Sequence, residues 1–212
     1  MNYPRDRVRI LDHPLIQQKL TKARERDTSR REFRDLLGEI AGLMVFELTR
    51  DYAVQPRRIE TPLAPFTGSK LASDVTVVPI LRAGLGMAEG ILRLIPQARI
   101  GHLGVYRDEK TLAPVAYYDK LPPNLTGSEV IVIDPMLATG GTCSYALGIV
   151  KRHGAQRVKF VCLVAAPTGI ERLLADHPDI TIFTAAIDEC LNELGYIVPG
   201  LGDAGDRLFG TE

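Results

Sequence analysis

A run of apolar residues, one acid and a loop of small residues over 130–142 could together hold a phosphorylated sugar. Val130–Ile133 contains only β-branched residues, which is typical of a buried strand. Gly140 and Gly141 carry no Cβ, so the backbone after the strand can approach a ligand closely. A helical pattern follows, and a helix there would point free N–H groups and the positive end of its dipole at the same place. Asp134, at the end of the strand, can accept hydrogen bonds from sugar hydroxyls or lie near a metal ion.

Residues 130–142 resemble the phosphoribosyl-diphosphate loop of the type I phosphoribosyltransferases. Two further segments narrow the resemblance to the uracil phosphoribosyltransferases: Tyr196–Thr211 is similar to their uracil-recognition segment, and Pro79–Gly84 also fits. The similarity spans nearly the whole chain. It implies a pentosyltransferase of pyrimidine salvage that converts uracil and 5-phosphoribosyl 1-diphosphate (PRPP) to UMP and diphosphate.

The resemblance implies that the PRPP site draws on four parts of the chain. Arg82 directly follows a predicted strand, and its planar fork of donors suits a pair of diphosphate oxygens. Arg107 begins an irregular segment that would form a flap over the diphosphate and exclude water. Lys110, close by, is more simply explained as a solvated loop residue. The full expected set is Arg82, Arg107, Asp134, Pro135, Met136, Leu137, Ala138, Thr139, Gly140, Gly141, Thr142 and Asp203.

The C-terminal segment is expected to read the base. Residues 200–205 match Gly-x-Gly-x-x-Gly, but too little chain follows for the helix and acidic residue of a dinucleotide site. Uracil offers two carbonyl acceptors and an N3–H donor along one edge, and main-chain groups of a rigid loop can pair with all three. Cytosine would leave such groups unpaired, which can discriminate by ~10⁴ or more. The resemblance assigns this role to Ile197, Gly202, Asp203 and Ala204.

The expected catalytic residues are Asp134, Arg107 and Asp203, although no residue stands out as a general base. Asp203 or the departing diphosphate could accept the proton of uracil N1. Many type I enzymes carry two consecutive acids where this chain has Asp134 and Pro135. We therefore expect Mg²⁺ to arrive bound to the diphosphate, keeping several waters, with no direct protein ligand.

Strands alternating with helices predict one α/β domain whose mainly parallel sheet is flanked by helices. Ligands bind beyond the carboxyl ends of the strands in such sheets, where the candidate residues would collect. We expect a helical arm over 1–70, a core over 71–190 with a β-hairpin flap at 107–123, and a small hood over 191–212. The expected strands are 75–80, 99–106, 115–118, 130–133, 158–165 and 180–185, and the best-marked helices begin at Ser29, Leu85, Thr142 and Gly169.

The composition argues against several other classes of function. The formal net charge of zero provides no general field for nucleic acid or an anionic membrane. No apolar run reaches the roughly 20 residues that span a membrane. Three widely spaced cysteines suggest reduced thiols and a cytoplasmic location rather than disulfides or zinc.

Three alternatives stay open at this point. A regulator that senses uracil or UMP and binds RNA shares the general fold, although no basic stripe is evident. A nicotinamide-dependent enzyme could use the glycines at 84, 86 and 90, but their spacing is one residue too long. A phosphoribosyltransferase for a purine is the nearest alternative, and the C-terminal segment argues against it. A homodimer or higher homo-oligomer is expected, and the resemblance adds GTP as an activator of some relatives.

Overall fold

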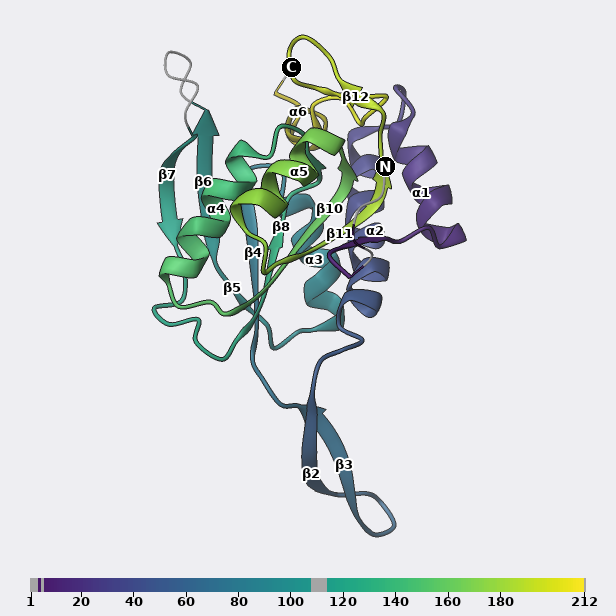
Figure 1. Cartoon of the computed structure of the whole chain (residues 1–212). Coiled ribbons are helices and arrows are strands. Elements are labelled where there is room, and N and C mark those ends of the chain that lie inside the picture. Colours follow the sequence, from purple (N-terminus) through teal and green to yellow (C-terminus); the bar gives the residue numbers. More distant parts are fainter. Residues whose placement is uncertain (1–3, 5, 108–113, 212) are drawn as a thin grey trace.

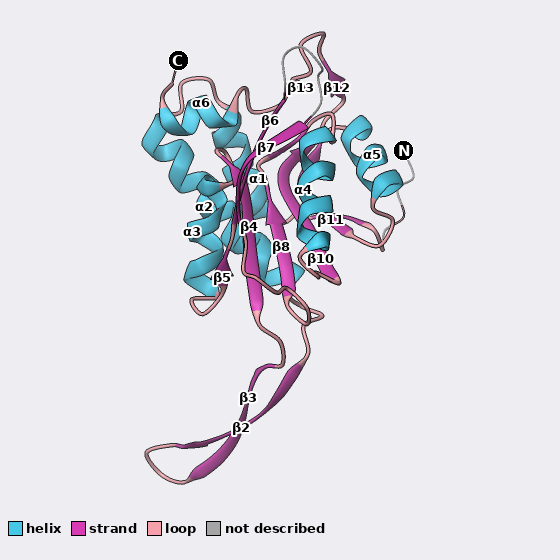
Figure 2. Ribbon diagram, turned by 90° about the vertical axis from the view of Figure 1, so that its left-hand side faces the viewer, coloured by secondary structure: helices cyan, strands magenta, loops and turns pink. Residues whose placement is uncertain are grey.

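The computed structural model describes residues 4, 6–107 and 114–211, with the side chain of Arg107 left out (Figure 1). A mainly parallel sheet with the strand order β1-β11-β10-β8-β4-β6-β7 lies between two layers of helices. Figure 2 shows α2 and α3 on one face and α4 and α5 on the other. The α/β class expected from the sequence is confirmed. The helices are α1 (Pro14–Arg24), α2 (Arg30–Leu48), α3 (Leu85–Leu94), α4 (Gly141–Arg152), α5 (Pro167–Asp176) and α6 (Ala204–Phe209).

The strands of the large sheet follow the expected order along the chain. They are β1 (Val8–Ile10), β4 (Val75–Leu81), β5 (Arg99–Ile100), β6 (His102–Arg107), β7 (Pro114–Lys120), β8 (Glu129–Ile133), β9 (Met136–Leu137), β10 (Arg157–Ala165) and β11 (Thr181–Ile187). β8 is central and pairs in parallel with β4 on one side and β10 on the other. A hairpin is present, because β6 and β7 pair antiparallel, but its first strand begins at His102, ahead of the expected range 107–123, and residues 108–113 of that range lie outside the described residues. Two small hairpins complete the fold: β2 (Val54–Glu60) with β3 (Pro65–Leu71), and β12 (Cys190–Leu191) with β13 (Ile197–Val198).

Helix α2 forms where the sequence predicts it. The Ser29 hydroxyl accepts a hydrogen bond from the backbone N–H of Glu32 at 3.3 Å, which caps the first turn. The apolar stripe of α2 is buried, and Phe33, Leu37 and Ile40 are fully inaccessible. This stripe joins α1, α3 and α6 in one hydrophobic core against the sheet, while α4 and α5 cover the other face.

Pro79 lies inside β4, which extends one residue beyond the expected strand 75–80. β4 continues to Leu81, and Pro79 pairs with Ile133 of β8. On its other side β4 pairs first with β5 and then with β6, which are separated at Gly101. Pro79 stands between these two registers, where the neighbouring strand is interrupted, so a missing N–H is tolerated there.

The expected helical arm over 1–70 needs correction in its secondary structure. It contains α1 and α2, but β1 belongs to the central sheet, paired with β11. The β2–β3 hairpin was not predicted, and it extends away from the body of the molecule (Figures 1 and 2). Every residue of β2 is exposed, so no alternation of apolar and polar residues marks it. The division into arm, core and hood stays a prediction.

Helices α2 and α3 approach each other closely through glycines. A Cβ on Gly90 would stand 1.8 Å from the carbonyl oxygen of Gly38, a distance that backbone atoms cannot accept. A Cβ on Gly38 would instead meet its nearest neighbour, the Gly86 oxygen, at 3.8 Å, which is ordinary contact. The two glycines therefore differ in how much the packing depends on them.

We expect Gly90→Ala to destabilise the protein by about 1–3 kcal/mol through overpacking. Gly38→Ala is the matched control, and it should be neutral or stabilising by about 0.5–1 kcal/mol because alanine is the better helix former. Urea unfolding of both variants measures the difference. Equal free energies of unfolding for the two variants would contradict this account of the packing.

Candidate functional site

A cleft of about 290 Å³ opens at the carboxyl ends of β4 and β8. Three segments enclose it: the loop after β4, the loop from Asp134 to the first turn of α4, and the C-terminal hood, whose elements lie beyond this end of the sheet (Figure 1). The lining residues are Ile80, Leu81, Arg82, Ala83, Val105, Asp134, Met136, Ala138, Thr139, Gly140, Thr142, Cys143, Gly195, Tyr196, Ile197, Gly202, Asp203, Ala204 and Gly205.

The loop before α4 presents backbone N–H groups to the cleft. Gly140 is the N-cap residue and has a left-handed conformation with φ of 78°, which glycine adopts without strain. A Cβ at this position would also stand 2.9 Å from the carbonyl oxygen of Gly169 on α5. No side chain caps the helix, so the N–H groups of its first turn remain available to an anion.

Asp134 lies partly exposed at the base of the cleft. Its Oδ1 accepts a hydrogen bond from the backbone N–H of Met136 at 3.1 Å, so the side chain also closes the turn after β8. Burial raises the pKa of Asp134 to about 7, and the negative charge of Asp203 adds to the rise, while the Met136 hydrogen bond opposes it. Beside it, burial raises the pKa of the Cys143 thiol well above its ordinary value. This thiol is therefore a protonated packing group and no nucleophile.

Arg82 connects the loop after β4 to the hood. Its Nη2 donates to Oδ1 of Asp206 on α6 at 3.2 Å, and its guanidinium lies 5.9 Å from the centre of the Phe209 ring. The side chain is about half exposed, so several of its donors face solvent and the cleft. Asp203 is the N-cap residue of α6, where its Oδ1 accepts from the N–H of Asp206 at 3.0 Å.

Arg24 of α1 holds the hood in place from outside the cleft. It donates two hydrogen bonds to the buried Asp188, at 2.7 and 2.8 Å, and a third to the carbonyl oxygen of Gly200 at 2.7 Å. Asp188 in turn accepts from the N–H of Gly200 at 2.8 Å. Gly200 has a φ of 62°, and a Cβ there would stand 2.2 Å from the Ile197 oxygen. The turn at 197–202 is thereby fixed in one conformation.

A second arginine, Arg207 of α6, fixes the other end of the hood. Its Nη1 donates to the carbonyl oxygens of Ala23 and Leu201, and its Nη2 donates to that of Glu25. The guanidinium also stacks on Phe33, 4.0 Å from the ring centre. These contacts tie the segment that carries the candidate base-recognition residues to α1 and α2.

The structure brings most of the expected site residues together. Arg82, Asp134, Met136, Ala138, Thr139, Gly140, Thr142, Ile197, Gly202, Asp203 and Ala204 all line the cleft. Pro135, Leu137 and Gly141 belong to the same loop but are not among the lining residues, and Leu137 is fully buried. The backbone of Arg107 ends β6, its side chain is not described, and Lys110 lies outside the described residues. Whether these residues act as expected stays a prediction.

Sequence reasoning missed eight lining residues: Ile80, Leu81, Ala83, Val105, Cys143, Gly195, Tyr196 and Gly205. Most of them directly flank expected residues, and that position was the only signal available. Gly195 is informative, because a Cβ there would come within 3.8 Å of the Thr139 methyl group. The turn before β13 therefore lies against the loop before α4.

Among the residues that the structure describes, no three His, Cys, Asp or Glu side chains gather where they could hold a metal ion. Asp134 and Asp203 are the carboxylates that line the cleft. Across the described ranges, no helix combines the length and the apolar character needed to cross a membrane.

Comparisons with known proteins agree on one family. The family model described as uracil phosphoribosyltransferase matches residues 10–211. A uracil phosphoribosyltransferase of Dictyoglomus turgidum is 56% identical over 206 residues, covering 97% of this chain and 100% of that protein. One of Halalkalibacterium halodurans is 56% identical over 207 residues, covering 97% of this chain and 99% of its own length.

Solved structures give the same picture of the fold. The structure of a protein from Aquifex aeolicus is 40% identical and superposes with a TM-score of 0.92, covering 97% of this chain and 99% of that one. A hypoxanthine phosphoribosyltransferase from Trypanosoma cruzi, complexed with IMP, is 11% identical with a TM-score of 0.51 and covers 77% of this chain and 76% of that one. At that identity the likeness shows the fold alone.

Because the folded chain holds a proton on Asp134 that the unfolded chain releases, stability should fall as pH rises from about 4 to about 7 and stay flat above. We expect Asp134→Asn to abolish this dependence and to raise the free energy of unfolding at pH 8 by on the order of a few kcal/mol. Asp27→Asn, which neutralises an exposed turn residue, is the control. Denaturant unfolding at pH 5 and pH 8 tests this, and a less stable Asp134→Asn at pH 8 would contradict it.

Proposed function

We propose, because the chain belongs to the uracil phosphoribosyltransferase family, that it transfers the phosphoribosyl group of PRPP to N1 of uracil and so makes UMP and diphosphate. The observation that carries the proposal is the cleft itself, which joins an anion-binding loop to a rigid main-chain turn. A nicotinamide-dependent enzyme does not account for both walls, whereas a regulator that senses UMP would use the same cleft without turnover. The identity of 56% over nearly the full length supports the same activity.

In the proposed reaction, uracil N1 forms a bond to the anomeric carbon of ribose as the bond to diphosphate oxygen breaks. Positive charge grows on the ribose ring and negative charge on the departing diphosphate. The protein acts by orienting the two reactants and by stabilising the separated charges. The proton of N1 passes to Asp203 or to the diphosphate, which leaves the base neutral.

We assign the donor to the walls formed by β4, β8 and α4. The free N–H groups before α4 and the hydroxyls of Thr139 and Thr142 bind the 5′-phosphate, and Asp134 accepts from the ribose hydroxyls. Arg82 and Arg107 bind the diphosphate, with Arg107 carried on the β6–β7 flap. Pro135, Leu137 and Gly141 shape the loop from behind. The pKa of Asp134 lies low enough for the carboxylate to form at neutral pH once donors surround it.

We assign uracil to the hood. Main-chain groups of Ile197 and of Gly202, Asp203 and Ala204 pair with its O2, N3 and O4 edge. The support is the rigidity of this turn, which Arg24 and Arg207 hold with hydrogen bonds at both ends. A fixed turn discriminates best, because it cannot move to satisfy cytosine, whose amino group replaces an acceptor.

Mg²⁺ fits this cleft as a companion of the diphosphate. The carboxylates of Asp134 and Asp203 face one cleft, close enough for the charge of Asp203 to affect the pKa of Asp134. Both can accept hydrogen bonds from metal-bound water. When bound, the ion would neutralise part of the diphosphate charge. Its binding would also favour the ionised form of Asp134.

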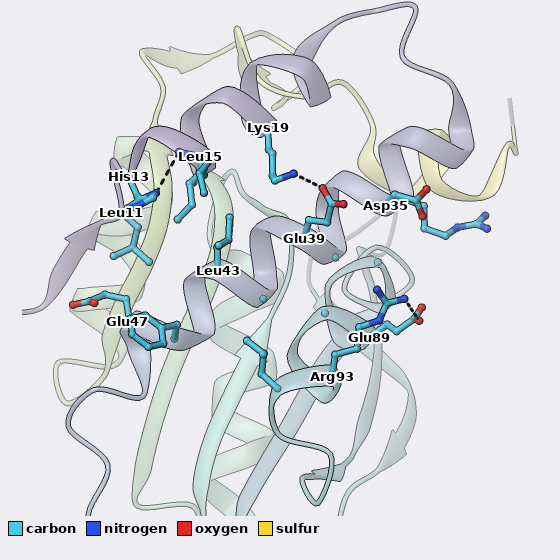
Figure 3. A pocket seen from close by; sticks show the side chains of 18 of the residues that line it. Leu11, His13, Leu15, Lys19, Asp35, Glu39, Leu43, Glu47, Glu89 and Arg93 are labelled. Carbon is cyan, nitrogen blue, oxygen red and sulfur yellow. Dashed lines mark hydrogen bonds and ion pairs between the residues drawn. The ribbon is translucent and has the colours of Figure 1, made fainter.

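We also propose that the active species is a homodimer. A groove of about 1350 Å³ is lined by residues of α1, α2 and α3 (Figure 3), the helices on the face of the sheet away from α4 and α5 (Figure 2). Exposed apolar side chains line it, including Phe46 (70% exposed) and Leu94 (58%). Paired charges such as Lys19 with Glu39 border it. A second copy of this chain would cover an apolar centre within a polar rim, which is the anatomy of a protein interface.

The β2–β3 hairpin supports the same occupant. The hairpin extends from the body of the molecule (Figure 2). Its apolar side chains Ile59, Leu63 and Phe66 are exposed. An isolated two-stranded hairpin is marginally stable in water. Packing of the hairpin against a partner would stabilise it. In a symmetric dimer, the hairpin of each chain can pack against the other chain.

Two further proposals do not depend on the dimer. Activation by GTP is proposed on the resemblance alone. A cytoplasmic location is proposed because all three cysteines are free thiols.

We expect the protein to sediment as a dimer, at twice the chain mass of 23.3 kDa. Placing charge in the groove with Phe46→Glu and Leu94→Glu together should give a monomer that stays folded by circular dichroism. Leu194→Glu, at a leucine in the hood that is even more exposed, should leave the dimer intact. Analytical ultracentrifugation measures all three, and a monomeric parent protein or a dimeric double variant would contradict the proposed interface.

The activity itself is tested with labelled uracil, PRPP and Mg²⁺, with cytosine, hypoxanthine and orotate as alternative bases and with GTP added or omitted. We expect UMP from uracil alone, loss of turnover with EDTA, and a rate at least about 10²-fold lower for Asp134→Asn with the fold intact. Tight, salt-dependent RNA binding without turnover would favour the regulator instead. Comparable rates with hypoxanthine would move the base assignment away from uracil.

A further inference from the structure

Arg172 of α5 lies against the loop before α4, although the two are far apart in the sequence. A Cβ on Gly141 would stand 3.2 Å from Nη1 of Arg172, 3.6 Å from Cζ and 3.8 Å from Nη2. A Cβ on Gly140 would stand 3.3 Å from the Cβ of Arg172. The stem of the side chain therefore runs beside the loop, and its guanidinium lies beside the backbone of Gly141.

The glycine at 141 has no conformational reason to be a glycine. Gly140 has a positive φ, whereas Gly141 is the first residue of α4 and does not. Alanine would stabilise the helix by about 0.5–1 kcal/mol relative to glycine. The absence of a side chain at Gly141 instead lets the guanidinium of Arg172 lie this close to the backbone, because a Cβ there would push it away by a few tenths of an ångström. A positive charge is thereby held beside the first residue of α4, although neither Gly141 nor Arg172 lines the cleft itself.

The charge of Arg172 is weakly engaged elsewhere. Its Nε lies 3.6 Å from Oδ2 of Asp176, and both side chains are about half exposed. That oxygen already accepts a 2.7 Å hydrogen bond from the Ser144 hydroxyl. An exposed pair of this kind contributes only about 0.3–0.5 kcal/mol. The guanidinium can therefore turn donors toward another acceptor at little cost.

We propose that Arg172 is a further binding residue for the 5′-phosphate of PRPP and UMP, acting from α5 behind the loop. This inference rests on the proposed function, because it assumes that a phosphate occupies the N-terminus of α4. The phosphate would then accept hydrogen bonds from the backbone N–H groups of the loop. It would also accept a charge-assisted hydrogen bond from Arg172, either directly or through a water molecule. The contact concerns the phosphate alone, so it should affect binding of the donor and leave the base and the bond-breaking step untouched.

The first test is calorimetry with ribose 5-phosphate, which needs no turnover. We expect Arg172→Ala to raise its dissociation constant about 3- to 10-fold at low ionic strength, with the difference shrinking in 1 M salt. Arg172→Lys should recover part of the affinity. Arg152→Ala is the matched control, because it removes an exposed arginine at the other end of α4, about 16 Å away. Equal affinity in Arg172→Ala, Arg152→Ala and the parent protein would overturn the proposal.

Steady-state kinetics separate this proposal from the proposed function. In Arg172→Ala, the KM for PRPP should rise by the same factor as the dissociation constant, while kcat and the KM for uracil change less than about twofold. Normal uracil turnover with an unchanged KM for PRPP would defeat the role of Arg172 alone. A parent protein that binds ribose 5-phosphate through Arg172 but never converts uracil would defeat the proposed function alone.

Gly141→Ala supplies an independent check, because its methyl group would stand 3.2 Å from Nη1 of Arg172 and would push the guanidinium away from the loop. We expect it to weaken ribose 5-phosphate binding in the parent background and to add little in the Arg172→Ala background. Additive losses in the double variant would show that the two residues act separately, and the proposed arrangement would then be wrong.

Discussion

The cleft depends on one set of contacts, the hydrogen bonds by which Arg24 and Arg207 hold the hood against the N-terminal helices. The hood has little regular structure of its own: a two-residue ladder and one short helix. Backbone carbonyls and the buried Asp188 accept the arginine donors, so breaking a contact would leave buried acceptors unpaired. These hydrogen bonds hold the turn at 197–202 in one conformation, although it has little regular structure. Without these contacts the loop before α4 would be an open anion site with no second wall.

The electrostatics of the cleft follow from placing two carboxylates at one end of a buried sheet. Asp134 takes its position from β8, a strand that is apolar on both faces, so desolvation is the main cause of its raised pKa. Asp203 takes its position from the N-cap of α6. A cationic or hydrogen-bond-donating ligand relieves the resulting cost. The arrangement destabilises the folded chain above neutral pH, and such a cost is common where a site is formed in advance of its ligand.

Much of this could be predicted from the sequence, for a physical reason. Strands and helices that bury one face repeat apolar residues at a regular spacing. β8 and β10 were predicted within one residue of both ends, and α2 and α3 within one residue of their beginnings. The loop residues could be predicted because glycine and an acid beside a buried strand have few other uses. The β2–β3 hairpin shows no regular alternation of apolar and polar residues, since neither of its faces is buried against the body of the chain. The two arginine contacts could not be predicted either, because their acceptors are mostly backbone carbonyls, which no residue type identifies.

Arg82 shows how the separate parts act on one another. It belongs to the loop after β4, yet it contacts Asp206 and Phe209 in α6, and Leu85 beyond it lines the groove of the proposed dimer. Within the described part of the chain, one of its donors is engaged, at 3.2 Å, in a partly exposed ion pair that contributes little by itself. An anion in the cleft can therefore recruit the remaining donors without breaking a strong contact. Phe209, whose ring lies 5.9 Å from this guanidinium, also lines the groove. A second chain in the groove would therefore pack against one of the residues that Arg82 contacts, so the proposed dimer interface and the proposed diphosphate site both border the same short helix.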